Sequence, residues 1–276
     1  MKTSFNLGLI GYPLGHSLSP EIHKAALDSC GLGGNYSLFP IVPDDQDGLI
    51  KILNRVRSGK ITGLNVTIPH KQNVIPLLDE LTPTVQAIGA VNTISMQNGK
   101  LTGDNTDAPG FLADLQKFLT PESQRHRDTK VGLVLGAGGS ARAVIYALVN
   151  DGWDVTVSAR RIEQAEELAD RYTIHTMQYD NLQPSTFDLL VNTTPVGMSP
   201  NVDASPWPAN LHFSSGVAIY DLVYNPRETK LVQDARAAGL PATTGLGMLI
   251  EQAALSFEIW TGCHPSRASL RNAVKN

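Results

Sequence analysis

A strand that runs directly into a glycine-rich turn constrains the fold of this chain more than any other feature. Apolar residues 131–135 are followed at once by Gly136, Gly138 and Ala141 in the spacing G-x-G-x-x-A, and a helical pattern begins at Ser140. In a βαβ unit, this spacing lets the backbone approach the pyrophosphate of a dinucleotide at the helix N-terminus. The turn therefore predicts a Rossmann-type, cofactor-binding domain. Its expected cofactor contacts are Gly136, Ala137, Gly138, Gly139, Ser140 and Ala141.

The end of the next predicted strand indicates which dinucleotide binds. NAD-binding domains usually carry an acidic residue there, about 20 residues after the turn, which binds the ribose 2′-hydroxyl. This chain has Ala159, Arg160 and Arg161 instead. Guanidinium groups pair with a phosphate through charge-assisted hydrogen bonds, whereas a carboxylate would repel it. Two solvated arginines are the alternative, although a helix N-terminus slightly disfavours cations. The sequence thus predicts NADP rather than NAD.

Strand-like and helix-like segments alternate along most of the chain, which is typical of an α/β fold with mostly parallel sheets. Strands are expected at residues 7–10, 36–42, 61–67, 130–135, 154–158, 188–192 and 217–222, with a hairpin over 91–103. Helices are expected after Ser19, which is expected to cap the first of them, and at 44–57, 71–78, 83–89, 107–119, 140–151, 162–171, 228–238 and 245–260. The polar stretch 120–129 is expected to connect two α/β series.

Composition excludes several classes of protein. The 276 residues favour two domains, and 42% hydrophobic and 17% charged residues are ordinary globular values. A net charge of −4 argues against binding to nucleic acid or to an anionic membrane surface. No apolar run approaches the roughly 18 residues that a membrane span needs. The apolar run after Lys2 is too short for a signal peptide, so a first strand and a cytoplasmic location are expected.

Two cysteines, Cys30 and Cys263, lie far apart in the sequence and have no histidine or cysteine partner at a metal-binding spacing. Two free thiols in a reducing cytosol are therefore expected, and no metal site.

Polar residues cluster where the strands of the first half end. Ser17 and Ser19 follow the first strand, Thr67 and Lys71 follow the third, and Asn92 lies at the hairpin. In open α/β sheets, ligands bind outside the carboxyl ends of the strands. Each residue also has a simpler interpretation: Lys71 alone suggests a solvated side chain at a helix start. Similarly, Asp107 alone suggests an N-cap, and His70 a solvated neighbour of Lys71.

Together these segments resemble the shikimate dehydrogenase family, which includes the quinate/shikimate dehydrogenases. The match is collinear from about residue 8 to about residue 260. The combination of Asn-Val-Thr-x-Pro-x-Lys at 65–71 with Gly-Asp-Asn-Thr-Asp at 103–107 is highly specific. Other matching segments lie at 11–20, 89–93, 136–143, 192–198, 221–226 and 245–253. The chain departs from the family at the second-strand motif of the cofactor domain. This motif is commonly Asn-Arg-Thr, and it is Ala159, Arg160 and Arg161 here.

The resemblance implies an NADP-dependent oxidoreductase that reversibly reduces 3-dehydroshikimate, a small-molecule substrate, to shikimate, in the pathway to chorismate and aromatic amino acids. Lys71 matches the family's catalytic lysine and Asp107 its partner. Whether Lys71 donates the proton or mainly orients the substrate stays open. Implied substrate contacts are Ser17, Ser19 and Tyr224 to the carboxylate, and Thr67, Lys71, Asn92, Asp107 and Gln252 to hydroxyls. Further implied cofactor contacts are Thr193, Leu222, Gly245 and Met248.

The order of the motifs predicts two domains. Residues 1–106 would form an α/β substrate-binding and catalytic domain, joined by the C-terminal segment 244–276, and residues 107–243 a Rossmann-type NADP-binding domain. The active site would then be the cleft between them. An enzyme of broader use, a quinate/shikimate dehydrogenase, is the nearest alternative. A non-catalytic metabolite sensor is another, although Lys71, Asp107 and the glycine turn are intact. Assembly as a homodimer is left open.

Overall fold

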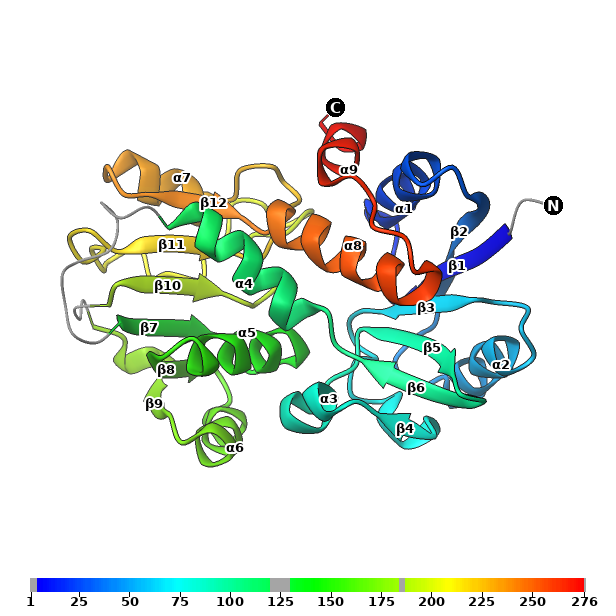
Figure 1. Ribbon diagram of the computed structural model, residues 1–276. Helices are drawn as coiled ribbons and strands as arrows, with labels where there is room; N and C mark the ends of the chain where they lie inside the picture. Colours follow the sequence, from blue (N-terminus) through cyan, green and yellow to red (C-terminus); the bar gives the residue numbers. More distant parts are fainter. Residues whose placement is uncertain (1–3, 120–129, 184–186, 276) are drawn as a thin grey trace. The chain divides into compact units, whose positions relative to one another are not determined.

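The computed structural model describes residues 4–119, 130–183 and 187–275 (Figure 1). The chain divides into two compact units: Met1–Gly110 together with Ile250–Asn276, and Phe111–Leu249. Each unit contains one 6-stranded sheet among its described residues, and both sheets are mostly parallel. The predicted α/β class is therefore confirmed. The predicted connection at 120–129 lies outside the described residues.

The sheet of the first unit has the order β2-β1-β3-β5-β6-β4. Strand β1 lies parallel to both β2 and β3, while β5 and β6 form the predicted antiparallel hairpin. Asn98 and Gly99, with φ of 50° and 79°, make its two-residue turn. The strands are β1 (Ser4–Gly11), β2 (Gly33–Pro40), β3 (Gly63–Val66), β4 (Glu80–Leu81), β5 (Thr93–Gln97) and β6 (Lys100–Asp104).

Three helices of the first unit begin where a side chain accepts a hydrogen bond from a free backbone N–H group. Asp45, Thr82 and Ser266 each accept such a bond as the N-cap of α2, α3 and α9. The apolar faces of α2 and α3 pack with the sheet in a core that includes Leu49, Leu64 and Leu101. The elements are α1 (Ser19–Ser29), α2 (Gln46–Arg57), η1 (Ile75–Leu77), α3 (Pro83–Ile88) and α9 (Arg267–Ala273). Helices α4 (Asp107–Phe118) and α8 (Leu246–Thr261) continue into the second unit.

The sheet of the second unit has the order β12-β11-β10-β7-β8-β9 and is parallel throughout its described pairs. This is the 3-2-1-4-5-6 order of dinucleotide-binding domains, in which the chain returns after the third strand to the other side of the first strand and then winds in the opposite direction. The switch point lies between β7 and β10 (Figure 1). The strands are β7 (Lys130–Leu135), β8 (Trp153–Ala159), β9 (His175–Gln178), β10 (Leu189–Asn192), β11 (Ala218–Asp221) and β12 (Ala242–Thr244).

The crossover helices of this unit pack on the sheet through small and branched apolar residues. Ala141, Val144 and Leu148 of α5 are fully buried, and α7 adds Leu231 and Val232 to the core. The elements are α5 (Gly139–Asn150), α6 (Ile162–Tyr172), η3 (Tyr179–Asn181) and α7 (Lys230–Ala237). No helix among the described residues is both long and apolar enough to cross a membrane.

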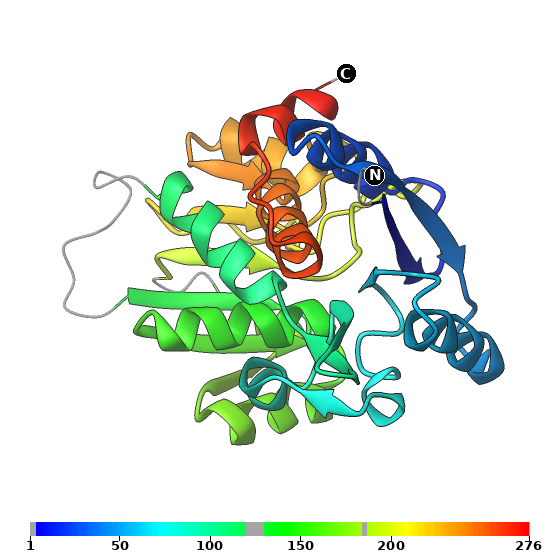
Figure 2. The same cartoon turned by 45° about the vertical axis from the view of Figure 1, so that its right-hand side comes forward.

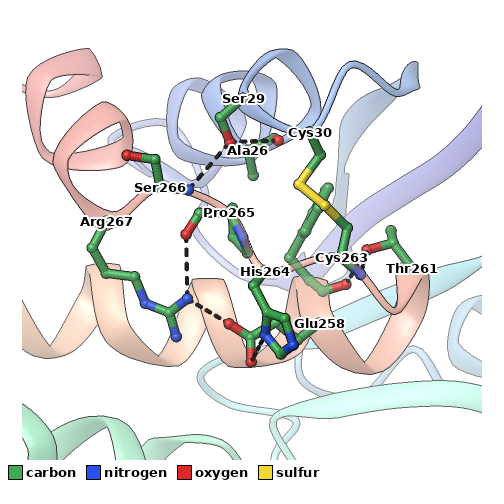
Figure 3. The surroundings of a disulfide bond; sticks show 11 residues. Ala26, Ser29, Cys30, Glu258, Thr261, Cys263, His264, Pro265, Ser266 and Arg267 are labelled. Carbon is green, nitrogen blue, oxygen red and sulfur yellow. Dashed lines mark hydrogen bonds and ion pairs between the residues drawn. A yellow bond between two sulfur atoms is a disulfide. The ribbon is translucent and has the colours of Figure 1, made fainter.

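The structure contradicts the prediction of two free thiols. Cys30, the C-cap of α1, forms a disulfide with Cys263 after α8 (Figure 3). Helices α1 and α9 lie side by side in both views (Figures 1 and 2), and the Ser266 N–H donates to Ser29 Oγ over 3.3 Å. This packing leaves the cysteine Cα atoms 6.4 Å apart, within the usual disulfide range. A sequence separation of 233 residues conceals that proximity from any spacing argument.

The helix expected at 71–78 is the second prediction that is wrong. This segment is mostly turn, and only the 3-10 helix η1 at Ile75–Leu77 is regular. Pro76 lies at the first positions of η1, where a missing N–H costs nothing, whereas inside a longer helix it would remove a hydrogen bond.

Candidate active site

Two loops meet at the carboxyl ends of the neighbouring parallel strands β1 and β3. The Thr67 N–H donates to the Ile10 carbonyl over 2.9 Å, and the Tyr12 N–H donates to the Ile68 carbonyl over 3.0 Å. A Cβ at Gly11 would lie 2.3 Å from Thr67 Cγ2, so only glycine allows this approach. The loop that carries the two predicted serines therefore lies against the loop that leads to Lys71.

Ser17 and Ser19 lie at the start of α1, and Ser19 does not cap this helix as the sequence predicts. Leu18 is the N-cap, and Ser19 is already the first helical residue, so its side chain does not cap the helix. Instead Ser17 Oγ accepts the Ser19 N–H over 3.3 Å. Ser19 is buried and Ser17 half-buried.

Lys71 and Asp107 form an ion pair. Lys71 Nζ lies 2.5 Å from Asp107 Oδ2, and the side chains are only 12% and 6% exposed. The Lys71 backbone is held too, because its carbonyl accepts the Val91 N–H over 2.7 Å. A pair this buried is screened by salt far less than a surface pair. The structure therefore places Lys71 against Asp107 and not in solvent.

Asn105 caps the helix that carries Asp107. Asn105 Oδ1 accepts the backbone N–H groups of Asp107 and Ala108 over 3.0 and 3.3 Å. Because Asn105 does the capping, both oxygens of the Asp107 carboxylate are available to side chains. The interpretation of Asp107 as an N-cap is thus wrong, and the carboxylate projects from the first turn of α4.

Asn92 links the ion pair to helix α8. Its Nδ2 donates to Asp107 Oδ1 over 2.9 Å and to Gln252 Oε1 over 3.3 Å. Four predicted side chains therefore form one connected, largely buried group: Lys71, Asn92, Asp107 and Gln252. We refer to these four as the Lys71 cluster.

His70 is not the solvated neighbour that the sequence predicts. It is fully buried, and its Nε2 lies 2.7 Å from the Ile41 carbonyl. The two adjacent side chains therefore have different surroundings: His70 braces the loop from within, while Lys71 reaches Asp107.

In the second unit, the glycine turn lies against the end of β10. Gly136 has φ 108°, and a Cβ there would lie 2.6 Å from Thr193 Oγ1, so both conformation and space require glycine. Thr193 is fixed in turn, since its N–H and hydroxyl both reach the Leu135 carbonyl, over 2.9 and 2.7 Å. Two predicted cofactor residues thus come together at the switch point of the sheet.

The residues around this turn leave room for a phosphate group. Apart from the adjoining residues, nothing in the described part of the chain lies within 4 Å of a Cβ placed on Gly138, the N-cap of α5. Ala141 is fully buried, as a close helix–sheet contact requires. Arg160 and Arg161 are exposed after buried Ala159, and within the described part of the chain neither forms an ion pair.

A buried carboxylate holds the neighbouring loops together. Asp221, at the end of β11, accepts hydrogen bonds from Thr229 Oγ1 (2.6 Å), Asn192 Nδ2 (2.8 Å) and the Val223 N–H (3.0 Å). Burial raises the pKa of Asp221 to about 6, although these donors favour its charged form.

Of the remaining predicted cofactor residues, Leu222 follows this carboxylate in the sequence and Gly245 packs against Leu222. A Cβ on Gly245 would lie 2.2 Å from the Leu222 carbonyl oxygen, so these two are packed together, and Met248 is buried in the first turn of α8. Tyr224 also belongs to this unit; it is half-buried, and burial raises its pKa.

Several structural partners of these sites were not singled out from the sequence. Asn105 and Thr106 lie inside the motif at 103–107, which identifies the segment but does not show which groups their side chains bond. Ser256 lies one helical turn after Gln252, and that spacing was its only signal. Asp221 was visible in its motif, whereas its burial was not. No group of metal-binding residues occurs among residues 4–119, 130–183 and 187–275.

Comparison with known proteins bears on all parts of the chain. Residues 9–94 match the family model for the shikimate dehydrogenase substrate binding domain. Residues 119–194 match that for shikimate/quinate 5-dehydrogenase, and residues 245–275 that for the shikimate 5′-dehydrogenase C-terminal domain. The chain is 40% identical to a shikimate dehydrogenase (NADP(+)) of Shouchella clausii, covering 97% of both proteins. The chain belongs to the shikimate dehydrogenase family.

Other members of the shikimate dehydrogenase family are similarly related. The NADP(+) enzyme of Bacillus subtilis is 38% identical over 97% of this chain and 95% of its own. A crystal structure from Thermus thermophilus, in complex with NADP(H) and shikimate, superposes with a TM-score of 0.85 at 38% identity, covering 98% of each chain. A quinate dehydrogenase from Corynebacterium glutamicum, in complex with NAD, has a TM-score of 0.83 at 31% identity, also covering 98% of each.

Proposed function

We propose that this protein is an NADP-dependent shikimate dehydrogenase, which reversibly reduces 3-dehydroshikimate to shikimate in the pathway to chorismate and aromatic amino acids. The observation that carries the proposal is the buried Lys71–Asp107 pair, joined to Asn92 and Gln252 within the Lys71 cluster. Membership of the family supplies the reaction, and this cluster supplies the groups that such a reaction needs.

Lys71 and Asp107 act as one catalytic unit in this proposal. Reduction of a carbonyl requires a proton at the oxygen while a hydride reaches the carbon. Lys71 Nζ would hold or move that proton, and Asp107 Oδ2 keeps the ammonium in place at 2.5 Å. Because Asn105 caps α4, the carboxylate is not engaged by the helix and serves the lysine instead.

The substrate would be recognised mainly by hydrogen bonds. We assign the ring hydroxyls to Thr67, Lys71, Asn92, Asp107 and Gln252, and the carboxylate to Ser17, Ser19 and Tyr224. A site of buried polar groups rejects an analogue that lacks a hydroxyl, because each group left without a partner costs roughly 1–3 kcal/mol. The burial of Ser19, Asn92 and Asp107 supports this form of selectivity.

The residues of the second unit fit NADP. When bound, NADP(H) supplies the hydride that the reaction exchanges with the substrate. The open space over Gly138 and the tight turn at Gly136 fit a pyrophosphate that approaches the backbone. We assign the 2′-phosphate to Arg160 and Arg161, which are exposed and free of ion pairs in the described chain. The proposed cofactor contacts also include Ala137, Gly139, Ser140, Ala141, Ala159, Thr193, Leu222, Gly245 and Met248.

The proposal includes a domain assignment. Residues 1–106 with 244–276 would bind the substrate and carry Lys71, and residues 107–243, which begin with Asp107, would bind NADP. The grouping of Lys71, Asn92 and Gln252 in one compact unit and of the glycine turn in the other supports this division, although Asp107 belongs to the first compact unit.

Location and assembly belong to the same proposal. We place the enzyme in the cytoplasm. Assembly as a homodimer stays open, and size-exclusion chromatography with light scattering tests it. The disulfide argues against a reducing compartment, where Cys30 and Cys263 would be thiols. Alkylating the protein during cell lysis tests the location: two modified cysteines support the cytoplasm, and two protected ones contradict it.

The reaction itself is tested by following NADPH absorbance with 3-dehydroshikimate, and NADP+ reduction with shikimate or quinate, each repeated with the NAD form. Turnover of shikimate with NADP+ well above quinate with NAD+ is expected. The reverse ranking would favour a quinate/shikimate dehydrogenase of broader use. Absence of turnover with every pair, despite NADP binding, would favour a non-catalytic metabolite sensor.

A further inference from the structure

The Lys71 cluster shares Asn92 with a second buried group of polar side chains. Thr93 and Ser256 have no exposed surface, Asn92 and Thr106 are 2% and 3% exposed, and Asn65 is 5% exposed. Ser256 comes from α8, whereas the others come from β3, β5 and the segments that adjoin β5 and α4. A buried polar group that lacks a hydrogen-bond partner destabilises the folded protein, so we follow the donor and acceptor of each bond in this group.

The orientation of the Asn92 amide is fixed by the backbone. The Thr106 N–H can only donate, and it lies 2.8 Å from Asn92 Oδ1. Asn92 Nδ2 therefore faces the other way, where it donates to Thr106 Oγ1 and to Asp107 Oδ1, each over 2.9 Å. The amide that contacts the catalytic carboxylate is held from behind by this arrangement.

Three hydroxyl groups continue from that amide. Ser256 Oγ lies 2.9 Å from Thr106 Oγ1 and 2.8 Å from Thr93 Oγ1, and Thr93 Oγ1 lies 2.9 Å from Asn92 Oδ1. A hydroxyl has one proton and two lone pairs. Thr106 Oγ1 receives the Asn92 amide proton and can pass its own to Ser256, Ser256 to Thr93, and Thr93 to Asn92 Oδ1. The donors then all run in one direction around a closed ring.

Two further contacts complete the account at Ser256. Its hydroxyl also lies 3.0 Å from the Gln252 carbonyl, which can only accept, so the single Ser256 proton is shared between that carbonyl and the nearer Thr93 Oγ1 at 2.8 Å. The other contact comes from Asn65. The Asn92 carbonyl can only accept, and it lies 3.1 Å from Asn65 Nδ2, so that amide is oriented as well. Asn65 Nδ2 also donates to Ser256 Oγ over 2.9 Å, which fills the second lone pair of that hydroxyl. Tyr36, stacked on His23 with ring centroids 4.2 Å apart, donates its hydroxyl to Asn65 Oδ1 over 2.9 Å.

We propose that Ser256 is a positioning residue for the reaction: its hydroxyl closes the ring through Thr93, Asn92 and Thr106 that holds the Asn92 amide against Asp107. Ser256 is the one member supplied by α8. Without it, the Thr93 and Thr106 hydroxyls are left with only the long contact of 3.4 Å between them, in place of two bonds of 2.8 and 2.9 Å. The inference rests on the proposed function for its effect on turnover, while the ring itself is a property of the free protein.

The test compares Ser256→Ala with Thr261→Ala. Both changes remove one hydroxyl of α8 that lies near the carbonyl four residues earlier, but Thr261 does not belong to the ring. For Ser256→Ala we expect kcat with shikimate to fall about 10-fold, because a loosened Asn92 misplaces Asp107. The KM for NADP+ should stay unchanged, and Ser256→Thr, which retains the hydroxyl, should recover most of kcat. Thr261→Ala should keep wild-type kcat.

A ring also predicts how two breaks combine. Thr93→Val removes the hydroxyl that bonds Asn92 Oδ1, and it should lower kcat as much as Ser256→Ala does. If Ser256→Ala proves too unstable to measure, Thr93→Val tests the ring in its place. The double variant should be little worse than either single one, because the ring is already open. Equal kcat for Ser256→Ala and Thr261→Ala, with only a lower melting temperature, would overturn the proposal, as would fully additive losses.

Hydrogen exchange separates this proposal from the proposed function. The Thr106 amide proton is bonded to Asn92 Oδ1, so it should exchange about 10-fold faster in Ser256→Ala than in Thr261→Ala, without any substrate. If the wild-type protein did not turn over shikimate, the proposed function would fail while this readout still tested the ring. Unchanged exchange in Ser256→Ala would sink the ring even in an active enzyme.

Discussion

Lys71 has a buried partner and a well-defined position, and the consequences of removing it are specific. Lys71→Ala should lower kcat about 100-fold or more while leaving NADPH affinity nearly unchanged, because the proton-exchanging group is lost but the cofactor residues lie elsewhere. Steady-state kinetics and NADPH titration measure both. Lys24→Ala is the control, since Lys24 forms only an exposed ion pair with Asp28. A change in KM alone would make Lys71 a binding residue.

Asp221 should make stability depend on pH in an unusual direction. Its folded pKa is about 6 against an ordinary 3.8, so the folded protein retains this proton between those values while the unfolded chain has released it. The contribution of Asp221 to stability is therefore present below about pH 4 and lost as pH rises through about pH 6. The free energy of unfolding should fall by about 3 kcal/mol across this pH range.

Urea unfolding at several pH values measures this effect. The difference in unfolding free energy between wild type and Asp221→Asn should fall across that window, because the variant lacks the titrating group. Asp203→Asn, which changes an exposed carboxylate, should not alter the pH dependence. A difference that does not vary with pH would mean that Asp221 stays ionised in its three hydrogen bonds.

Where β8 ends and α6 begins, two adjacent arginines should distinguish the cofactors. Arg160→Ala combined with Arg161→Ala should weaken NADP binding much more than NAD binding, because only NADP carries the 2′-phosphate that the guanidinium groups would contact. Fluorescence titration with both nucleotides measures the two dissociation constants. An equal loss for both would contradict the 2′-phosphate assignment.

The disulfide ties the end of α1 to the segment between α8 and α9 (Figure 3). Reduction, or Cys30→Ser, should lower the free energy of unfolding by about 2–4 kcal/mol, because the unfolded chain regains freedom over a long loop. Helix α9 should stay folded, since Leu270 and Val274 are buried and Arg267 forms ion pairs with Glu251 and Glu258. Chemical unfolding with and without dithiothreitol measures the loss; identical curves would show that the bond adds nothing.

Local sequence patterns predicted the elements with uneven success. The glycine turn and helix α5 follow the predicted order because strand, turn and helix are contiguous in sequence. The short strands β4, β9 and β12 were not anticipated, since two to four residues carry too little periodicity and take their conformation from a neighbouring strand. Helix α9 was missed for the same reason, with seven residues and one fully buried side chain.

Cofactor binding should stabilise the folded protein as a unit. A ligand that binds only the native state adds about 2.7 kcal/mol at a concentration 100 times its dissociation constant. NADP+ should therefore raise the melting temperature, and NAD+ at the same concentration should raise it less. Thermal unfolding followed by circular dichroism tests this ranking. Equal shifts from the two nucleotides would favour an enzyme of broader cofactor use.

The chemistry of the site could be recognised from the amino-acid sequence, whereas the way its groups support one another could not. Motifs such as Asn-Val-Thr-x-Pro-x-Lys and the glycine turn are short, because a loop that carries several functional groups must carry them at fixed local spacings. These spacings identified the family, which the comparisons confirm, and they predicted the cofactor turn and the catalytic pair.

Packing between distant segments decided the rest. Asn92 meets Gln252 across 160 residues, Thr93 meets Ser256 across 163, and Cys30 meets Cys263 across 233. Burial raises the pKa of Asp221 to about 6, which its place in a motif did not indicate. His70 is likewise buried inside the fold. Hydrogen-bond partners and desolvation depend on which surfaces come together, and no local pattern of residues encodes that contact.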